Sequence, residues 1–144
     1  MNYLVMFFTR LQSAIRYRYT NIVTPYTYEC EQIVKLLWRY NLIGFPFCVV
    51  YKRYGGRISY IHFSLRVNGV GEQCIRKIKL VSKPSNRVFW TSEQIKDWYR
   101  LQIQYRECFN RAYLIFRLKN NMYMVTDKVL HLRAGGEPLV MLWI

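Results

Sequence analysis

Apolar positions at the start of the chain predict an amphipathic helix over residues 1–17. Apolar side chains recur there at spacings of three and four residues, which places them along one face of a helix. They are Leu4, Phe7, Phe8, Leu11 and Ile15. The next segment, Thr20–Thr24, is short and rich in β-branched residues, and Pro25 follows it. It is therefore expected to form a strand.

A second amphipathic helix is expected to begin after Thr27, a residue type that caps helix N-termini. Two glutamates follow near the positive end of the helix dipole. Glu31 and Lys35 have the spacing of a helical ion pair. The apolar face of this helix is expected to consist of Cys30, Ile33, Val34, Leu37 and Trp38.

The next two segments, residues 42–54 and 57–67, predict a hairpin with its turn at Gly55–Gly56. In the second segment polar residues alternate with Ile61, Phe63, Leu65 and Val67. This period of two predicts a strand with one buried face. His62 is then expected on the polar face as a solvated side chain, not as a ligand or a base.

The glycine-rich segment Asn68–Gly71 is expected to separate a first domain, residues 1–68, from a second domain, residues 69–144. In the second domain, strands are expected at residues 74–81, 87–90 and 113–116, and turns at Lys83–Asn86 and Lys119–Asn121. A capping box at Thr91–Gln94 predicts a helix that carries Ile95, Trp98 and Tyr99 on one side.

The last third of the chain predicts a short helix, a glycine stop and a buried strand. Thr126 and Asp127 are N-cap residue types, and Gly135–Gly136 lie where a helix ends in the left-handed region. Residues 139–144 are all apolar, as in a strand that is covered on both faces. The order of elements predicts an α+β fold of two small α/β domains joined by a short linker.

The charge of the chain indicates a polyanionic partner. There are 22 Lys and Arg against 8 Asp and Glu, a net charge of +14, and such a field attracts nucleic acid or anionic lipid. Hydrophobic residues make up 52% of the chain, which favours a packed core over disorder. No apolar run approaches the roughly 18 residues that span a bilayer, so an integral membrane protein is not expected. A membrane surface would leave the basic strands of the second domain unexplained, so no membrane partner is expected.

The sequence lacks the residue spacings that catalysis and metal binding require. The four cysteines are widely spaced, without a C-x-x-C pair, and neither of the two histidines has an obvious catalytic neighbour. No P-loop, paired carboxylates or nucleophile–base arrangement is recognisable. We therefore expect no catalytic residues, no metal, no cofactor and no small-molecule substrate.

Basic residues are interleaved with aromatic ones along the whole chain. The segments are Arg16–Tyr19, Tyr51–Tyr54, Trp98–Arg100 and Tyr105–Arg106. Cations contact phosphates, and aromatic or guanidinium planes stack on exposed bases, so the pattern favours RNA. At any single pair the simpler interpretation is a core aromatic residue beside a solvated charge.

Several short motifs, in this order, resemble the family of the eighth small-subunit ribosomal protein of the bacterial type. They are Thr9-Arg10-Leu11, Pro25 before the second helix, Leu42-Ile43 after it, Val81–Pro84, Arg87–Phe89, Val125–Lys128 and Gly135–Glu137. The resemblance implies two small α/β domains and a structural role in the small ribosomal subunit. Its implied partners are a folded helical region in the central domain of small-subunit rRNA and the neighbouring ribosomal proteins.

A mitochondrial location is expected from the composition. The chain holds 13 Tyr and 8 Phe but few alanines, which fits the coding bias of an A+T-rich organelle genome. The arginine-rich first twenty residues lack acids, as transit peptides do, but an ordinary first helix explains them equally. An alternative function, a basic protein–protein adaptor in a large mitochondrial assembly, stays open.

The resemblance implies RNA contacts in both domains. In the first domain they are Thr9, Arg10, Arg16, Arg18, Tyr26 and Thr27. In the second they are Ser82, Lys83, Arg87, Lys119, Asn120, Asn121, Thr126, Lys128 and Glu137. Cations would meet phosphates, hydroxyls and amides would meet 2′-hydroxyls, and Glu137 would accept a bond from a base or hydroxyl. The second domain is expected to hold most of the selectivity, with its two turns beside Thr126 and the Gly-Gly-Glu segment.

Two departures from the family pattern affect this interface. The family has Ser-Thr-Ser-Lys-Gly in the turn that grips RNA, whereas this chain has Lys119-Asn120-Asn121 followed by Met122 and Tyr123. The chain is also longer over Arg100–Arg111, a segment rich in Tyr and Arg. This segment is expected to extend the third helix and to cover a neighbouring protein or an altered rRNA surface.

Overall fold

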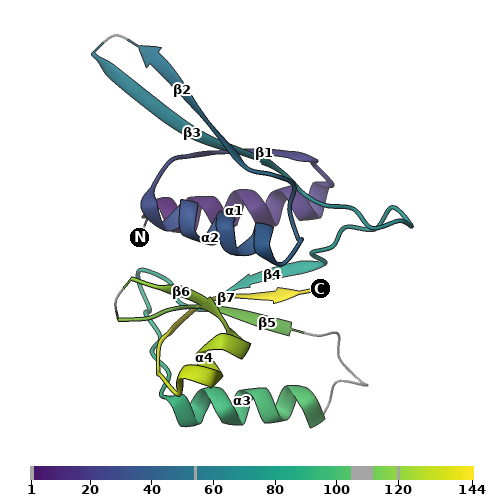
Figure 1. Ribbon diagram of the computed structural model, residues 1–144, viewed down its shortest axis with the longest axis vertical. Helices are drawn as coiled ribbons and strands as arrows, with labels where there is room; N and C mark the ends of the chain where they lie inside the picture. The colour runs from purple at the N-terminus through teal and green to yellow at the C-terminus, as the bar shows by residue number, and fades with distance from the viewer. Residues whose placement is uncertain (1, 54, 105–111, 120) are drawn as a thin grey trace. The chain divides into compact units, whose positions relative to one another are not determined.

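The computed structural model describes residues 2–53, 55–104, 112–119 and 121–144. Over these residues the chain forms four helices and two antiparallel sheets, which confirms the α+β fold class (Figure 1). It divides into two compact units, Met1–Ile75 and Arg76–Ile144.

The division falls later in the chain than the expected boundary after residue 68. The reason is that the glycine-rich loop folds back onto the first unit. Val67 bridges Gln73, and the Cys74 N–H donates to the Arg66 carbonyl over 3.0 Å. The loop is therefore an excursion within the first unit.

The first unit consists of two helices and a three-stranded sheet of order β1-β3-β2. Its elements are α1 (Asn2–Tyr17), β1 (Asn21–Pro25), α2 (Tyr28–Arg39), β2 (Phe47–Arg53) and β3 (Gly56–Ser64). All five apolar positions predicted for α1 are buried. The ring of Phe7 lies 6.0 Å from that of Phe63, so α1 packs on the Phe63 face of the sheet. Both helices lie on one side of this sheet (Figure 1).

The predicted apolar face of α2 is wrong at one position. Leu36 is buried, because it lies three residues after the buried Ile33 and one before Leu37. Trp38 is 44% exposed, and its ring meets that of Phe45 edge-on at 5.5 Å. The predicted cap is confirmed, since the Thr27 hydroxyl accepts from the Cys30 N–H over 3.2 Å.

The β2–β3 hairpin forms as predicted, but its histidine is not solvated. His62 stacks against Phe47, with ring centres 5.2 Å apart. Its Nε2 atom is buried and has no hydrogen-bond partner among the described residues. Val67, expected on the buried face, is exposed and belongs to the glycine-rich excursion, where it bridges Gln73.

The second unit is a four-stranded sheet of order β4-β7-β5-β6 with two helices. Its elements are β4 (Lys77–Leu80), α3 (Ser92–Gln104), β5 (Ala112–Arg117), β6 (Tyr123–Val125), α4 (Thr126–Leu132) and β7 (Glu137–Trp143). Its core joins Ile95 of α3, Leu114 and Phe116 of β5, and Val129 of α4. The predicted apolar final strand forms as β7, in which Leu139, Val140 and Leu142 are buried, but it ends at Trp143 and Ile144 is exposed.

Residues 87–90 do not form the expected strand. Within them only Trp90 pairs, as an isolated bridge whose N–H and carbonyl both bond to Gly136. This bridge places the segment beside the start of β7 and not beside β4. The turn at Lys83–Asn86 does form, since the two end residues exchange both backbone hydrogen bonds.

The ends of α4 differ from the expectation. The N-cap is Val125, whose side chain makes no capping bond, whereas the Thr126 hydroxyl bonds to the N–H and carbonyl of Leu114 on β5. The left-handed residue at the C-terminal end is Arg133, with φ of 52°. The only glycines with positive φ in the described part are Gly55 and Gly71, so Gly135–Gly136 act by another property.

Candidate nucleic-acid interface

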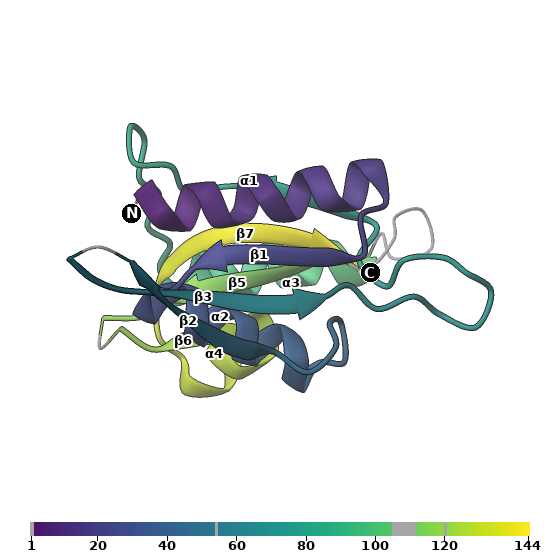
Figure 2. The same cartoon turned by 90° about the horizontal axis from the view of Figure 1, so that it is seen from above.

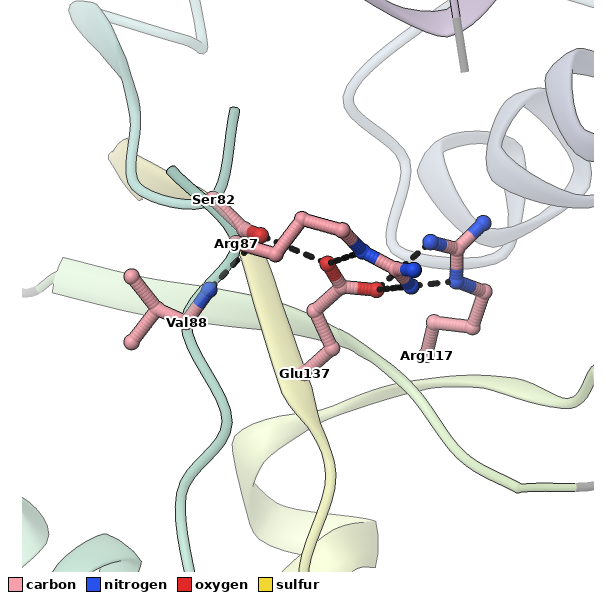
Figure 3. A network of polar contacts seen from close by, with 5 residues as sticks. All are labelled: Ser82, Arg87, Val88, Arg117 and Glu137. Carbon is pink, nitrogen blue, oxygen red and sulfur yellow. Dashed lines mark hydrogen bonds and ion pairs between the residues drawn. The ribbon is translucent and has the colours of Figure 1, made fainter. Parts of the chain in front are cut away.

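A buried carboxylate organises the basic surface of the second unit. Glu137, the first residue of β7, is only 2% exposed. The Ser82 hydroxyl donates to its Oε2 atom over 2.6 Å, and Arg87 reaches both carboxylate oxygens at 3.1 Å (Figure 3). Arg117 donates from its Nε atom to Oε1, also over 3.1 Å. Three segments that are distant in sequence therefore meet at one side chain.

Backbone pairing alone brings Ser82, Arg117 and Glu137 close together. Arg117 stands opposite Glu137 in the antiparallel β5–β7 ladder. Ser82 follows β4, and its N–H bonds to the Leu139 carbonyl of β7. The Ser82 hydroxyl also accepts from the Val88 N–H over 3.1 Å, which holds the loop between these two residues closed. The loop thereby carries Arg87 to the carboxylate.

Gly135 and Gly136 allow these segments to approach closely. A Cβ atom at Gly135 would lie 2.7 Å from the Trp90 carbonyl oxygen. At Gly136 it would lie 2.9 Å from the Leu118 side chain and 3.2 Å from the Arg117 carbonyl oxygen. Packing therefore requires glycine at Gly135, where the neighbour is backbone, whereas at Gly136 the nearest atom is the end of the flexible Leu118 side chain. The left-handed conformation that was expected at these glycines is not found.

The electrostatics of the cluster fix all three groups in their charged forms. Burial alone would raise the pKa of Glu137, but the hydrogen bonds from Arg87, Ser82 and Arg117 outweigh it and lower the pKa from 4.5 to about 2. The hydrogen bond to Glu137 raises the pKa of Arg87. At Arg117 burial lowers the pKa, but the hydrogen bond to Glu137 raises it, and the net change is upward. Two cations therefore share one anion, which leaves an excess positive charge.

Arg87 presents part of this excess at the surface. Its side chain is 48% exposed, although it is held by Glu137. Its Cζ atom lies 5.1 Å from the centre of the Phe89 ring, which is itself 65% exposed. A guanidinium that is fixed at one edge and stacked on an open ring is suited to phosphate and base contact.

Three residues predicted to contact RNA are instead interior residues. Ser82, Thr126 and Glu137 are each at most 2% exposed. Their polar atoms bond within the unit, to Glu137, Leu114 and the two arginines respectively. They position the surface and do not form it. The expectation that Glu137 accepts a bond from RNA is corrected, because both of its oxygens are occupied by arginine.

The remaining predicted residues of the second unit are on the outside. They are Lys83, Arg87, Lys119, Asn121 and Lys128. Lys119 and Asn121 belong to the turn that begins two residues after Arg117, and Arg117, rather than the turn itself, bonds to the carboxylate that Ser82 and Arg87 also reach. Asn120 lies outside the described residues. So do residues 105–111 of the longer segment, of which α3 occupies the part up to Gln104.

Four of the six predicted residues of the first unit, Thr9, Arg10, Tyr26 and Thr27, already have partners within it. The Thr9 hydroxyl donates to the Val5 carbonyl over 2.8 Å, and Arg10 donates to the Val23 carbonyl over 2.8 Å. Thr27 caps α2 as described above. Tyr26 donates to Glu31, and this bond raises the pKa of the tyrosine.

The two arginines near the end of α1 are exposed. The Cζ atom of Arg16 lies 5.8 Å from the centre of the Tyr17 ring. Arg18 follows with a left-handed φ of 59°. Both therefore remain candidates for phosphate contact, in contrast to the interior residues of the second unit.

Sequence reasoning missed Arg117, the most buried cation of the cluster. The available signal was weak: an arginine ends an apolar strand two residues before a turn. The strand expected over residues 74–81 forms as the edge strand β4, but its exposed Lys77 and Lys79, which alternate with buried Ile78, were not among the predicted contact residues. The Lys77 Nζ atom lies 5.2 Å from the centre of the Trp143 ring.

Charge is distributed over both units. The first carries nine Lys and Arg against three Glu, and the second carries thirteen against five acids. No cluster of three potential metal ligands occurs among the described residues. In that same part of the chain, every helix is too short or too polar to cross a membrane. No protein-family model matches the sequence, and no curated protein matches it closely enough to indicate a relative.

Proposed function

We propose that this protein is a structural RNA-binding component of a small ribosomal subunit. It would bind a folded, helical region of the central domain of the rRNA, mainly through phosphates and 2′-hydroxyls, because A-form RNA hides its major groove. The charge of +14, the absence of catalytic spacings and the motif resemblance support this proposal. The Tyr- and Phe-rich composition favours a mitochondrial subunit.

The observation that carries the proposal is the Arg87–Glu137–Arg117 cluster. An isolated surface arginine loses side-chain entropy when it binds phosphate. Here the buried carboxylate holds Arg87 beforehand, while about half of that side chain stays exposed. Two guanidiniums on one carboxylate leave net positive charge beside two exposed turns. This arrangement suits an anionic, irregular surface such as folded RNA.

Ultraviolet crosslinking in isolated organelles, followed by sequencing of the attached RNA, tests the proposal. The expected result is crosslinks concentrated in one region of small-subunit rRNA and co-sedimentation of the protein with the small subunit. The alternative, a basic adaptor that contacts only proteins, predicts co-sedimentation without RNA crosslinks. That second result would overturn the proposed function.

A further inference from the structure

The outer face of the first unit's sheet carries a continuous row of rings and apolar side chains. Side chains alternate between the two faces of a strand, and the register of the three strands shows which of them share a face. Phe63 and Ile61 are buried on the helix side. The opposite face displays Val23, Phe47, Tyr51, Ile58, Tyr60 and His62.

This face is open along most of its length. Phe47 is 55% exposed and Tyr51 is 45% exposed. Ring contacts link the row, because Phe47 stacks on His62 and Tyr51 meets Tyr60 edge-on at 5.6 Å. Figure 2 shows β1, β3 and β2 side by side in this sheet, and in Figure 1 the β2–β3 hairpin projects beyond the helices of its own unit. Such a row of exposed rings is unusual for a surface that only faces solvent.

The three strands that form this face contain no acidic residue. No Asp or Glu occurs between Glu31 and Glu72, a segment that includes β2 and β3. Lys52 and Arg57 stand opposite each other near the end of the hairpin, where both are exposed, although the alternation of side chains places them on the face of Ile61 and Phe63. At the other edge of the sheet, Arg10 donates to the Val23 carbonyl of β1. A partner of this face is therefore expected to be anionic as well as flat.

We infer that this face binds single-stranded RNA by stacking its unpaired bases on Phe47 and Tyr51. Nucleobases are flat rings on an anionic backbone, so they match both properties of the face. Sheets that display aromatic residues bind single-stranded RNA in this way. The inference rests on the proposed function and extends it: the second unit takes folded RNA, and the first takes an unpaired strand next to it.

Fluorescence anisotropy with the full chain tests the inference. The probes are labelled oligouridine of about 12 nucleotides and a fully paired hairpin from the central domain of the rRNA. Phe47→Ala and Tyr51→Ala are each expected to weaken oligouridine binding roughly tenfold, with little change for the hairpin. Tyr3→Ala, which removes an equally exposed ring from α1, is the matched control and is expected to change neither affinity.

Leucine at the same positions separates stacking from general apolar contact. Phe47→Leu and Tyr51→Leu are expected to bind oligouridine as weakly as the alanine variants, because leucine has no ring to stack. Full affinity with leucine would instead indicate a face for apolar protein segments and would overturn the inference. Unchanged melting temperatures show that each variant is folded.

The controls also separate this inference from the proposed function. A wild-type chain that binds the paired hairpin but not oligouridine contradicts the inference alone. A chain that binds neither RNA contradicts the proposed function as well.

Discussion

Arg117 and Glu137 face each other across the β5–β7 ladder, and the Arg117 Nε atom donates to the carboxylate over 3.1 Å. The pair lies at the edge of the core that Phe116 joins, and Glu137 is almost wholly buried. A buried carboxylate is tolerated only because Arg117, Arg87 and Ser82 all donate to it. The cluster thus has two roles. It stabilises the second unit, and it holds the exposed Arg87 in place at the surface of that unit.

The first prediction concerns removal of this carboxylate. Glu137→Gln leaves two guanidiniums without their counter-ion, so the free energy of unfolding is expected to fall by about 3 kcal/mol. Urea unfolding followed by tryptophan fluorescence measures the change. Asp97→Asn, which removes an exposed acid from α3, is the control and is expected to have little effect. Equal stability of the two variants would show that the cluster contributes nothing.

The second prediction is a pH dependence of this contribution. The folded-state pKa of Glu137, about 2, lies below its ordinary value of 4.5. The stabilisation is therefore fully present above about pH 5 and is lost as the pH falls towards 2. The difference in unfolding free energy between the wild type and Glu137→Gln should shrink over this interval. A difference that stays constant from pH 6 to pH 3, both approximate limits, would contradict the assigned pKa.

The third prediction concerns the close approach at the double glycine. In Gly135→Ala the new methyl group would lie 2.7 Å from the Trp90 carbonyl oxygen, so the backbone has to shift. The expected cost is about 1–3 kcal/mol of unfolding free energy. Gly69→Ala is the matched control, since a Cβ there meets nothing within 4 Å. Thermal melting of both variants measures the contrast, and an equal effect at the two sites would refute the packing argument.

The fourth prediction reassigns Thr126. Its hydroxyl bonds to both backbone groups of Leu114 in the core, so Thr126→Val is expected to cost about 1–3 kcal/mol of stability. RNA selectivity should be unchanged. Below its melting temperature, the variant should have the same ratio of affinities for the central-domain rRNA fragment and for a scrambled fragment as the wild type. A stable variant with a reduced ratio would restore Thr126 to the RNA interface.

The local elements could be predicted from the sequence because their signals are local. The spacing of Leu4, Phe7 and Leu11 gave the buried face of α1, and Thr27 gave the start of α2. Trp38 was misassigned because periodicity alone does not distinguish the border of an apolar face from its centre. Leu36, at the other border of the apolar face, is the residue that is buried in the core.

The candidate site could be predicted only in part, because its contacts join distant segments. Glu137 lies 55 residues from Ser82 and 20 from Arg117, and no sequence spacing reports such pairs. Thr126 looked like a helix cap because threonine is a capping residue type. Its actual partner, Leu114, is supplied by the neighbouring strand β5. Ser82, Thr126 and Glu137 were expected to contact RNA, but contacts between distant segments bury them in the second unit.

The central claim is that the second unit binds folded small-subunit rRNA through its exposed cations. A competition titration at two salt concentrations, with the central-domain fragment and a scrambled fragment, tests it. The wild type is expected to prefer the central-domain fragment at both salt concentrations. The double variant Lys83→Ala, Lys119→Ala should lower the slope of log affinity against log salt by about 2 for either RNA.

Lys96→Ala, which removes a cation from α3 of the same unit, is the control and should leave the slope unchanged. Arg16→Ala and Arg18→Ala in the first unit should weaken binding to both RNAs equally, as phosphate contacts do. The decisive measurement is the affinity ratio of the wild-type chain for the two fragments. The account predicts at least a roughly tenfold preference for the central-domain fragment, whereas equal affinities at both salt concentrations would contradict it.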